Sequence, residues 1–306
     1  MGEPHAAGLS EIIVSHWALC GSDLRGLRTG SVIPRRMGHE LSGRLSSGID
    51  AGRVVSIFPI VPCFACRVCS IGDWRKCPDR RTLGFELAGA RAGTLTVDTR
   101  LVYLHAPEGN GSRACLTEHV ACAVHIASDP NVKSLTRQHN VLIVGDGAMA
   151  FASAVVLRRL NEANIRLLVK HPDRLLVART LGINAESFSS SVFIPEDINF
   201  LILACDLGDT KIYSTSTETP LMIAHVARQS SAMGQHYSRP TYLIDSYAYL
   251  PSDFSLAVKL IDSPDFDLSY AKEYDEPKIC SDSDAASTQL RSLPRSTVKY
   301  IFRRSK

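Results

Sequence analysis

The sequence predicts an α/β protein in which an irregular, strand-rich region precedes a doubly wound parallel sheet. Three observations lead to this prediction. Short β-type runs, punctuated by Gly and Pro, fill roughly the first 125 residues. After Asn140, strand-like and helix-like segments alternate, which is the pattern of a parallel α/β sheet. A glycine-rich loop follows the first strand of this second region, at the point where a helix should begin.

Each predicted element has a local reason. Runs without polar breaks suit strands that are buried on both faces, and Gly182 closes the second helix of the α/β region. The predicted strands cover residues 11–14, 53–57, 94–97, 141–144, 165–169, 200–204 and 298–302. The predicted helices cover residues 151–161, 172–181, 221–229 and 253–262.

Composition and charge narrow the class of protein. The 306 residues are 45% hydrophobic and 21% charged, as in a soluble protein of two domains. A net charge of +3 is too small to indicate a nucleic-acid surface. The longest apolar stretch, residues 141–157, contains Asp146 and small-residue breaks, so we expect no membrane span. No apolar segment of a secretory signal follows Met1, and the many thiols favour a reducing compartment, the cytoplasm.

Four cysteines stand close together in the first region: Cys63, Cys66, Cys69 and Cys77. Four thiolates at one tetrahedral centre bind zinc tightly and leave no position for a substrate, which predicts a structural zinc site. A disulfide knot is the alternative, but it suits short secreted chains, and this chain has nine cysteines, an odd number. An iron–sulfur cluster is less favoured, because the last spacing does not fit the bacterial ferredoxin pattern.

The glycine loop comprises Gly145, Asp146, Gly147, Ala148, Met149 and Ala150. In a strand–loop–helix context, Gly145 allows the tight turn and Gly147 lets the backbone approach a pyrophosphate. Ala150 keeps the helix close to the strand. Asp146 places negative charge beside the expected phosphates, so its side chain is expected to point away. The loop therefore predicts a dinucleotide site.

The end of the second strand of the α/β region bears on which dinucleotide binds. An NAD site usually has Asp or Glu there, whereas this chain has Lys170 and His171, with Arg174 following. These basic residues could neutralise a 2′-phosphate, which favours NADP over NAD. The alternative interpretation is that residues 173 and 174 only begin a solvated helix.

A second metal site can be assembled from residues outside the cysteine run. Cys20, His39 and Glu118, with Glu40 beside His39, offer sulfur, nitrogen and oxygen ligands. Three such ligands with one open position describe a catalytic zinc. Taken singly, each has an ordinary explanation as a buried or surface residue. Their joint occurrence with the cysteine run and the glycine loop favours the interpretation as a catalytic metal site.

In motif order and spacing, the chain resembles the zinc-dependent medium-chain dehydrogenase/reductase family, which includes alcohol, sorbitol and threonine dehydrogenases. The resemblance implies a GroES-like catalytic domain over residues 1–125 with the zinc lobe at 63–77. It also implies a Rossmann domain over 126–245 and a C-terminal return to the catalytic domain over 246–306. By resemblance, Cys20, His39 and Glu118 bind the catalytic zinc and Glu40 is an alternative ligand. Asp23 would orient His39, and Ser22 would begin a proton relay.

The resemblance implies hydride transfer between a secondary alcohol and NAD(P), with two zinc ions per chain. The alcohol would be a polyol, sugar, cyclitol or amino alcohol, and the protein a homodimer or homotetramer. The predicted helix at 221–229 replaces a strand that usually flanks the nicotinamide, and two opening strands are missing. A non-catalytic or regulatory NAD(P)-binding relative is therefore the alternative. A zinc-ribbon nucleic-acid protein is disfavoured by the few basic and aromatic residues around the cysteine run.

Overall fold

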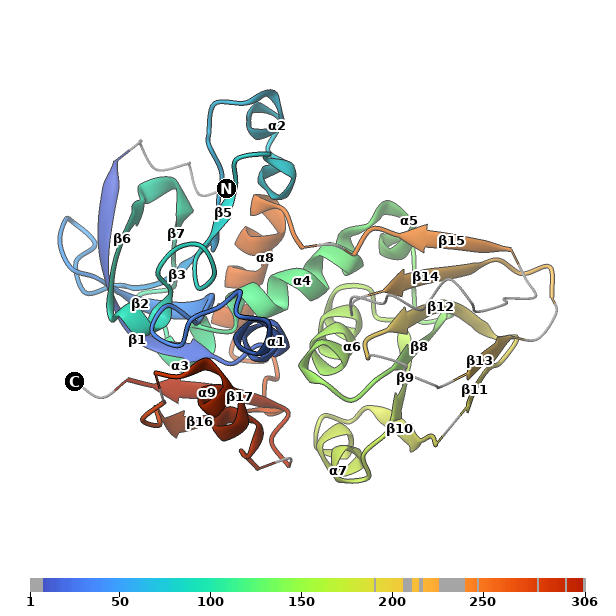
Figure 1. Ribbon diagram of the computed structural model, residues 1–306. Coiled ribbons are helices and arrows are strands. Elements are labelled where there is room, and N and C mark those ends of the chain that lie inside the picture. Colours follow the sequence, from blue (N-terminus) through green and yellow to red (C-terminus); the bar gives the residue numbers. More distant parts are fainter. Residues whose placement is uncertain are drawn as a thin grey trace. The chain divides into compact units, whose positions relative to one another are not determined.

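The computed structural model describes residues 8–189, 191–205, 211–214, 217–225, 240–246, 248–279, 281–294 and 296–304. The chain forms two compact units. The first combines Met1–Ala121 with Leu250–Lys306, and the second is Cys122–Tyr249. The predicted α/β class is confirmed, with a mixed sheet in the first unit and a parallel sheet in the second. Figure 1 shows the elements of both units.

The first unit contains one large sheet with the strand order β16-β17-β1-β2-β3-β7, in which β6 also pairs with β1, and a separate antiparallel pair of β4 and β5. Its strands are β1 (Leu9–Ala18), β2 (Glu40–Leu45), β3 (Val54–Ile57), β4 (Ile60–Val61), β5 (Arg81–Thr82), β6 (Thr94–Asp98), β7 (Val102–Leu104), β16 (Ala271–Asp275) and β17 (Lys299–Arg303). Its helices are α1 (Gly21–Thr29), α2 (Arg67–Ser70), α3 (Gly111–Ala114), α8 (Pro251–Asp262) and α9 (Ser283–Arg291), with 3-10 turns η1 (Trp74–Lys76), η2 (Ala90–Ala92) and η3 (Thr99–Leu101).

The sheet of the first unit joins the two ends of the chain. Strand β17 pairs antiparallel with β1 and parallel with β16. The C-terminal strands therefore lie beside the N-terminal strand, as Figure 1 shows in red and blue. On β1, Ile12 and Val14 are buried and Glu11 is exposed, which is the alternation of a strand with one covered face.

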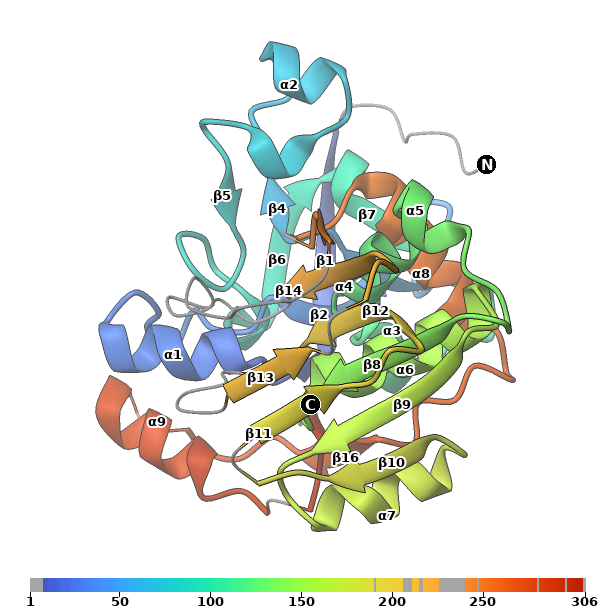
Figure 2. The same cartoon turned by 90° about the vertical axis from the view of Figure 1, so that its right-hand side faces the viewer.

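The second unit contains a parallel sheet with the order β10-β9-β8-β12-β14-β15. Numbered along the chain from β8, these six strands have the order 3-2-1-4-5-6 of a Rossmann fold. Figure 2 shows β8, β9 and β12. The strands are β8 (Asn140–Val144), β9 (Asn164–Val169), β10 (Asn184–Ser187), β12 (Ile198–Leu203), β14 (Leu221–His225) and β15 (Thr241–Ile244), and a separate parallel pair is formed by β11 (Ser191–Ile194) and β13 (Lys211–Ser214). The helices are α5 (Pro130–Lys133), α6 (Ala148–Leu160) and α7 (Asp173–Thr180).

The helix predicted for residues 221–229 is wrong where the structure describes it. Residues 221–225 form β14, a strand of the parallel sheet that pairs with β12 and β15. Leu221, Ile223 and Ala224 are buried there, and a short apolar run does not by itself distinguish a buried strand from a buried helix. Residues 226–229 lie outside the described residues. With β14 and β15 in place, the sheet continues beyond β12, where the sequence pattern had weakened.

Several of the described helices were not predicted from the sequence, and α1, α4 and α9 are the longest of them. Helix α4 (Thr117–Ser128) begins in the first unit and continues into the second. Most of its residues from Val120 to Ala127 are buried. A helix that is covered on most sides lacks the amphipathic stripe by which helices are recognised in a sequence.

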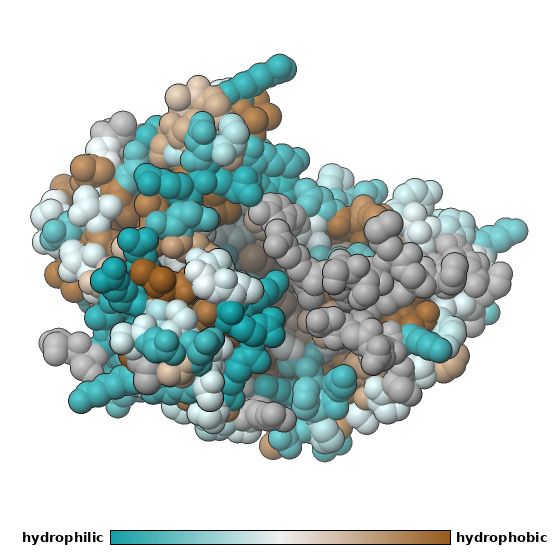
Figure 3. Space-filling model, in the orientation of Figure 1, coloured by the Kyte–Doolittle hydropathy of each residue, from teal (hydrophilic) through white to brown (hydrophobic). Residues whose placement is uncertain are grey.

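Within the described parts of the chain, no helix combines the length and the apolar character needed to cross a membrane. On the face shown in Figure 3, hydrophilic and hydrophobic residues are interspersed among the described residues. This mixture is ordinary for a folded domain, whose surface always retains many apolar atoms.

Candidate metal centres and dinucleotide loop

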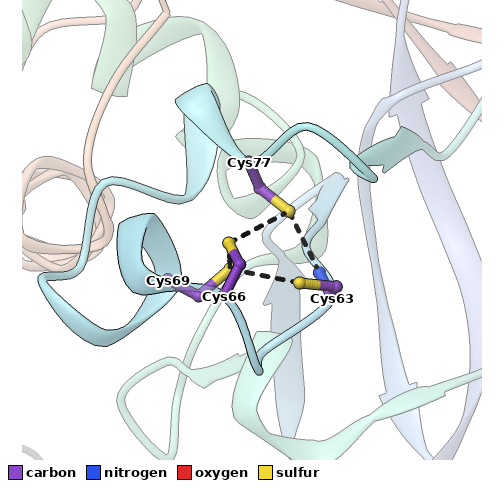
Figure 4. Close-up of side chains that lie close together, drawn as sticks. All are labelled: Cys63, Cys66, Cys69 and Cys77. Carbon is purple, nitrogen blue, oxygen red and sulfur yellow. Dashed lines mark hydrogen bonds between the residues drawn. The ribbon is translucent and has the colours of Figure 1, made fainter.

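The four cysteines of the predicted structural site converge on one point (Figure 4). Their Sγ atoms are 3.8 Å apart for Cys63 and Cys69, 3.4 Å for Cys66 and Cys69, and 3.9 Å for Cys66 and Cys77. Zinc–sulfur bonds of about 2.3 Å place tetrahedral sulfurs about 3.8 Å apart, whereas a disulfide needs about 2.05 Å. All four cysteines are free. The spacing of the sulfurs therefore fits a zinc ion and excludes disulfides among them in this structure.

Local backbone geometry brings the four thiols together. Cys66 precedes α2 and Cys69 lies within it, while Cys77 follows η1. Phe64, with φ of 56°, turns the chain between the first two cysteines. Its ring contacts Trp74 at 5.2 Å between centroids, and the Arg100 guanidinium lies 3.5 Å from its centroid. These contacts fix a lobe that is too small to have a core of its own.

Two of the thiols, those of Cys63 and Cys69, have pKa values shifted in opposite directions. Hydrogen bonds from the backbone N–H groups of Ala65 and Cys66 lower the pKa of Cys63 to about 7. Burial, together with hydrogen bonds shared with the other thiols, raises the pKa of Cys69 to about 12. A zinc ion would displace these protons, because only thiolates bind it.

The second group consists of Cys20, His39 and Glu40, whose ligand atoms all lie within 4.8 Å of one another. Cys20 is the N-cap of α1, His39 precedes β2 and Glu40 is its first residue. Gly38 sets this turn with φ of 95°, and a Cβ there would lie 2.7 Å from Cβ of Ala90. Glycine is therefore required by both the dihedral angle and the available space. The group contains sulfur, nitrogen and oxygen donors of the kind that bind a catalytic zinc.

Two neighbours orient the imidazole of His39. Its Nδ1 lies 3.2 Å from Oδ1 of the fully buried Asp23, and its Nε2 lies 3.5 Å from Oγ of Ser22. Burial lowers the pKa of His39, but the charges of Asp23 and Cys20 raise it by more, so the pKa lies well above its ordinary value. A carboxylate on Nδ1 leaves Nε2 to face a metal, which is the usual arrangement behind a metal-binding histidine.

Glu40 has a buried partner that was not predicted from the sequence. Nζ of Lys299, on β17, lies 2.5 Å from Oε1 of Glu40, and the two side chains are 2% and 1% exposed. The other oxygen, Oε2, is buried and has no hydrogen-bond partner. A buried carboxylate oxygen without a partner is unfavourable, so a cation bound at this oxygen fits the donor set. In the sequence, the only indication of this partner is that Lys299 is a single charged residue within the largely apolar run at 298–302.

Glu118, predicted as the third ligand, does not belong to this group. It lies in the first turn of α4, half-buried, and its charge contributes to raising the pKa of Lys299. The structure therefore brings Cys20 and His39 together with Glu40, the alternative ligand. Coordination by Glu118 stays a prediction.

The glycine loop joins β8 to α6. Gly145 has φ of 139°, and a Cβ there would lie 2.8 Å from the carbonyl carbon of Ala204 on the neighbouring chain segment. Among the described residues, apart from its chain neighbours, no atom lies within 4 Å of the place where a Cβ of Gly147 would stand, so these residues leave room for a ligand at the N-terminus of α6. Ala148 and Met149 form the first turn of this helix. This open, positively polarised helix end fits the pyrophosphate of a dinucleotide.

The side chain of Asp146 turns towards the end of β9. Its Oδ2 accepts hydrogen bonds from the backbone N–H groups of Lys170, at 3.0 Å, and His171, at 2.7 Å. The same oxygen lies 2.7 Å from Nδ1 of the His171 ring. The side chains of Lys170 and His171 are exposed and that of Arg174 is half-buried. Two of the three basic residues predicted to hold a 2′-phosphate, Lys170 and His171, are thus hydrogen-bonded to a carboxylate.

Known proteins resemble this chain in sequence and fold. Residues 7–108 match the alcohol dehydrogenase GroES-like domain. Galactitol 1-phosphate 5-dehydrogenase of Escherichia coli K12 is 25% identical over 186 residues, covering 58% of this chain and 53% of the relative. Sorbitol dehydrogenase of Halalkalibacterium halodurans is 27% identical over 202 residues, covering 62% and 58% respectively. The chain spans about half the length of the curated relatives it matches.

A solved structure extends the likeness in fold to nearly the whole chain. A protein assigned as a zinc-binding dehydrogenase from Sinorhizobium meliloti 1021, bound to NADP, superposes with a TM-score of 0.76 at 15% identity. The match covers 99% of this chain and 94% of that protein. The chain therefore contains an alcohol dehydrogenase GroES-like domain at residues 7–108, and its fold is similar to that of a zinc-binding dehydrogenase over nearly its whole length.

Proposed function

We propose that the chain is a zinc-dependent oxidoreductase that transfers hydride between a secondary alcohol and NAD(P), giving a ketone. The observation that carries the proposal is the group of Cys20, His39 and Glu40, which gathers three ligand types at one point. The Rossmann sheet with its open glycine loop supplies a place for the dinucleotide within the same chain. Relatives that act on galactitol 1-phosphate and sorbitol support a substrate among polyols, sugars, cyclitols or amino alcohols.

The residues around the group suit oxidation of an alcohol. A bound zinc would act as a Lewis acid on the alcohol oxygen, and a bound dinucleotide would accept the hydride. Ser22 lies beside Nε2 of His39 and is placed to receive the hydroxyl proton of a substrate and pass it on. Asp23 fixes the orientation of the His39 ring. Lys299 holds one oxygen of Glu40 and leaves the other free to bind.

Metal analysis combined with ligand variants tests this function. The purified protein should contain two zinc ions per chain, one for each group of ligands. Cys20→Ala and His39→Ala should each lose one zinc and the turnover of a broad alcohol panel with both dinucleotides. Cys122→Ala, outside both groups, is the matched control and should keep both properties. Full activity in both ligand variants, or only one zinc in the unaltered protein, would contradict the proposal.

The alternative is a non-catalytic or regulatory relative that binds NAD(P) on the same scaffold. The irregular sequence pattern after Ala204 is the main reason to consider it. In the structure, β14 and β15 form regular strands in part of that region. Tight dinucleotide binding without turnover on any alcohol would favour this alternative. The cytoplasmic location and the homodimeric or homotetrameric state stay predictions.

A further inference from the structure

The carboxylate of Asp146 lies at the end of β9, where it is hydrogen-bonded to Lys170 and His171. In this fold the adenosine ribose comes to the end of the second strand, here β9, and NAD and NADP differ by a phosphate on that ribose. The residues after β9 are Lys170 and His171, neither of which is acidic. The glycine loop supplies the missing acid, since Oδ2 of Asp146 is hydrogen-bonded to the backbone of both residues.

We propose that Asp146 selects the dinucleotide: its carboxylate reads the ribose hydroxyls and disfavours a 2′-phosphate, so that the chain prefers NAD to NADP. The inference rests on the proposed function, whose dinucleotide it specifies. It reverses the preference for NADP that the basic residues alone indicate.

The hydrogen bonds explain the direction of this preference. The backbone N–H groups of Lys170 and His171 and the ring nitrogen of His171 would be natural donors to a 2′-phosphate. All three already meet the same oxygen of Asp146, at 3.0, 2.7 and 2.7 Å. A 2′-phosphate would have to displace this carboxylate or lie beside it, and like charges at such distances repel. Ribose hydroxyls, in contrast, can donate to a carboxylate.

The anchoring of Asp146 makes the effect specific. Its side chain is only 14% exposed, whereas that of His171 is 56% exposed. Because this carboxylate is largely buried and is held by three hydrogen-bond donors, moving it aside for a second anion would cost free energy. The basic side chains of Lys170 and Arg174 still attract phosphate, so removal of the Asp146 charge should expose a latent affinity for NADP.

Direct binding measurements test the proposal without any dependence on turnover. The proteins are the full chain, Asp146→Asn, Asp146→Ser, and Asp173→Asn as the matched control. Asp173 is an exposed acid that begins α7. Its replacement by Asn changes the net charge by the same amount as Asp146→Asn, but it leaves the residues of β9 unaltered. The probes are NADH and NADPH, followed by fluorescence, and 5′-AMP and adenosine 2′,5′-bisphosphate, followed by calorimetry. Thermal melting confirms that each variant is folded.

We expect the unaltered chain to bind NADH at least about ten-fold more tightly than NADPH, a ratio equivalent to about 1.4 kcal/mol. Both Asp146 variants should lower this ratio by about ten-fold or more, mainly by tighter binding of NADPH, and the fragments should follow. Asp173→Asn should leave the ratio nearly unchanged.

Two outcomes overturn the proposal and differ in what they imply. In the first outcome both dinucleotides bind, and the Asp146 variants either leave the ratio of affinities unchanged or bind NADPH more weakly. Selection by Asp146 is then refuted, and weaker binding of NADPH would mean that Asp146 supports His171 as a phosphate ligand. If neither dinucleotide nor either fragment binds the unaltered chain, the dinucleotide part of the proposed function fails with it.

Discussion

Replacement of Lys299 by methionine should destabilise the protein strongly. The ammonium and the carboxylate of Glu40 are 2.5 Å apart, and both side chains are almost completely buried. Methionine preserves the length and apolar contacts of the lysine stem but leaves the Glu40 charge without its partner. Removing one member of a buried ion pair costs about 3–5 kcal/mol. We therefore expect the free energy of unfolding of the zinc-free protein to fall by about this amount.

Urea denaturation in the presence of a chelator measures this effect, with Lys272→Met as the matched control. Lys272 lies on β16, directly beside β17, and its side chain is exposed. Its replacement should change the free energy of unfolding by no more than about 0.5 kcal/mol. The double variant Lys299→Met with Glu40→Gln should be more stable than Lys299→Met alone, because the uncompensated charge is gone.

The loss of stability in Lys299→Met should depend on whether zinc is bound. Zinc bound at Glu40 would neutralise the carboxylate that Lys299 no longer pairs with, so zinc should restore part of the stability of Lys299→Met. The reasoning is refuted if Lys299→Met behaves like Lys272→Met, or if Glu40→Gln adds to its cost rather than relieving it.

Three further predictions concern other parts of the first unit. Cys77→Ser should lower the melting temperature by about 5 °C or more, at about 2–4 °C per kcal/mol, and remove the stabilisation by zinc, while Ser70→Ala should do neither. Burial lowers the pKa of His105 from 6.5 by more than Asp262 raises it, so stability should fall as the pH drops below about 6.5. His105→Gln, which cannot take up this proton, should flatten the fall in pH-dependent denaturation, and an unchanged slope would contradict the assignment to His105. In zinc analysis, Glu118→Gln should keep the metal bound by Cys20 and His39 whereas Glu40→Gln should weaken it about ten-fold or more; the reverse result would restore Glu118 as the third ligand.

Local features were predictable from the sequence, whereas contacts over long separations were not. The cysteine run and the alternation of strands and helices after Asn140 are encoded within short segments, so spacing alone revealed them. Lys299 and Glu40 are 259 positions apart in the sequence. The strand predicted at residues 298–302 therefore did not reveal that Lys299 pairs with Glu40. Asp146 was visible as a charge in the glycine loop, but its partners at the end of β9 became apparent only when the two strands were placed side by side.

Lys299 supplies a positive charge to the group of Cys20, His39 and Glu40 before any metal binds. Burial lowers the pKa of Lys299, but the negative groups of Glu40, Cys20 and Glu118 raise it by more. Oε2 of Glu40 is still buried without a hydrogen-bond partner beside this ammonium, so a cation is favoured there. The ammonium nevertheless compensates part of the charge before any metal arrives. The sulfurs of Cys63, Cys66, Cys69 and Cys77 are instead hydrogen-bonded to one another. Stepwise chelation should therefore cost more stability at the cysteine lobe than at Cys20 and His39, and the Cys77→Ser and Cys20→Ala variants, compared by thermal melting, provide the measurement.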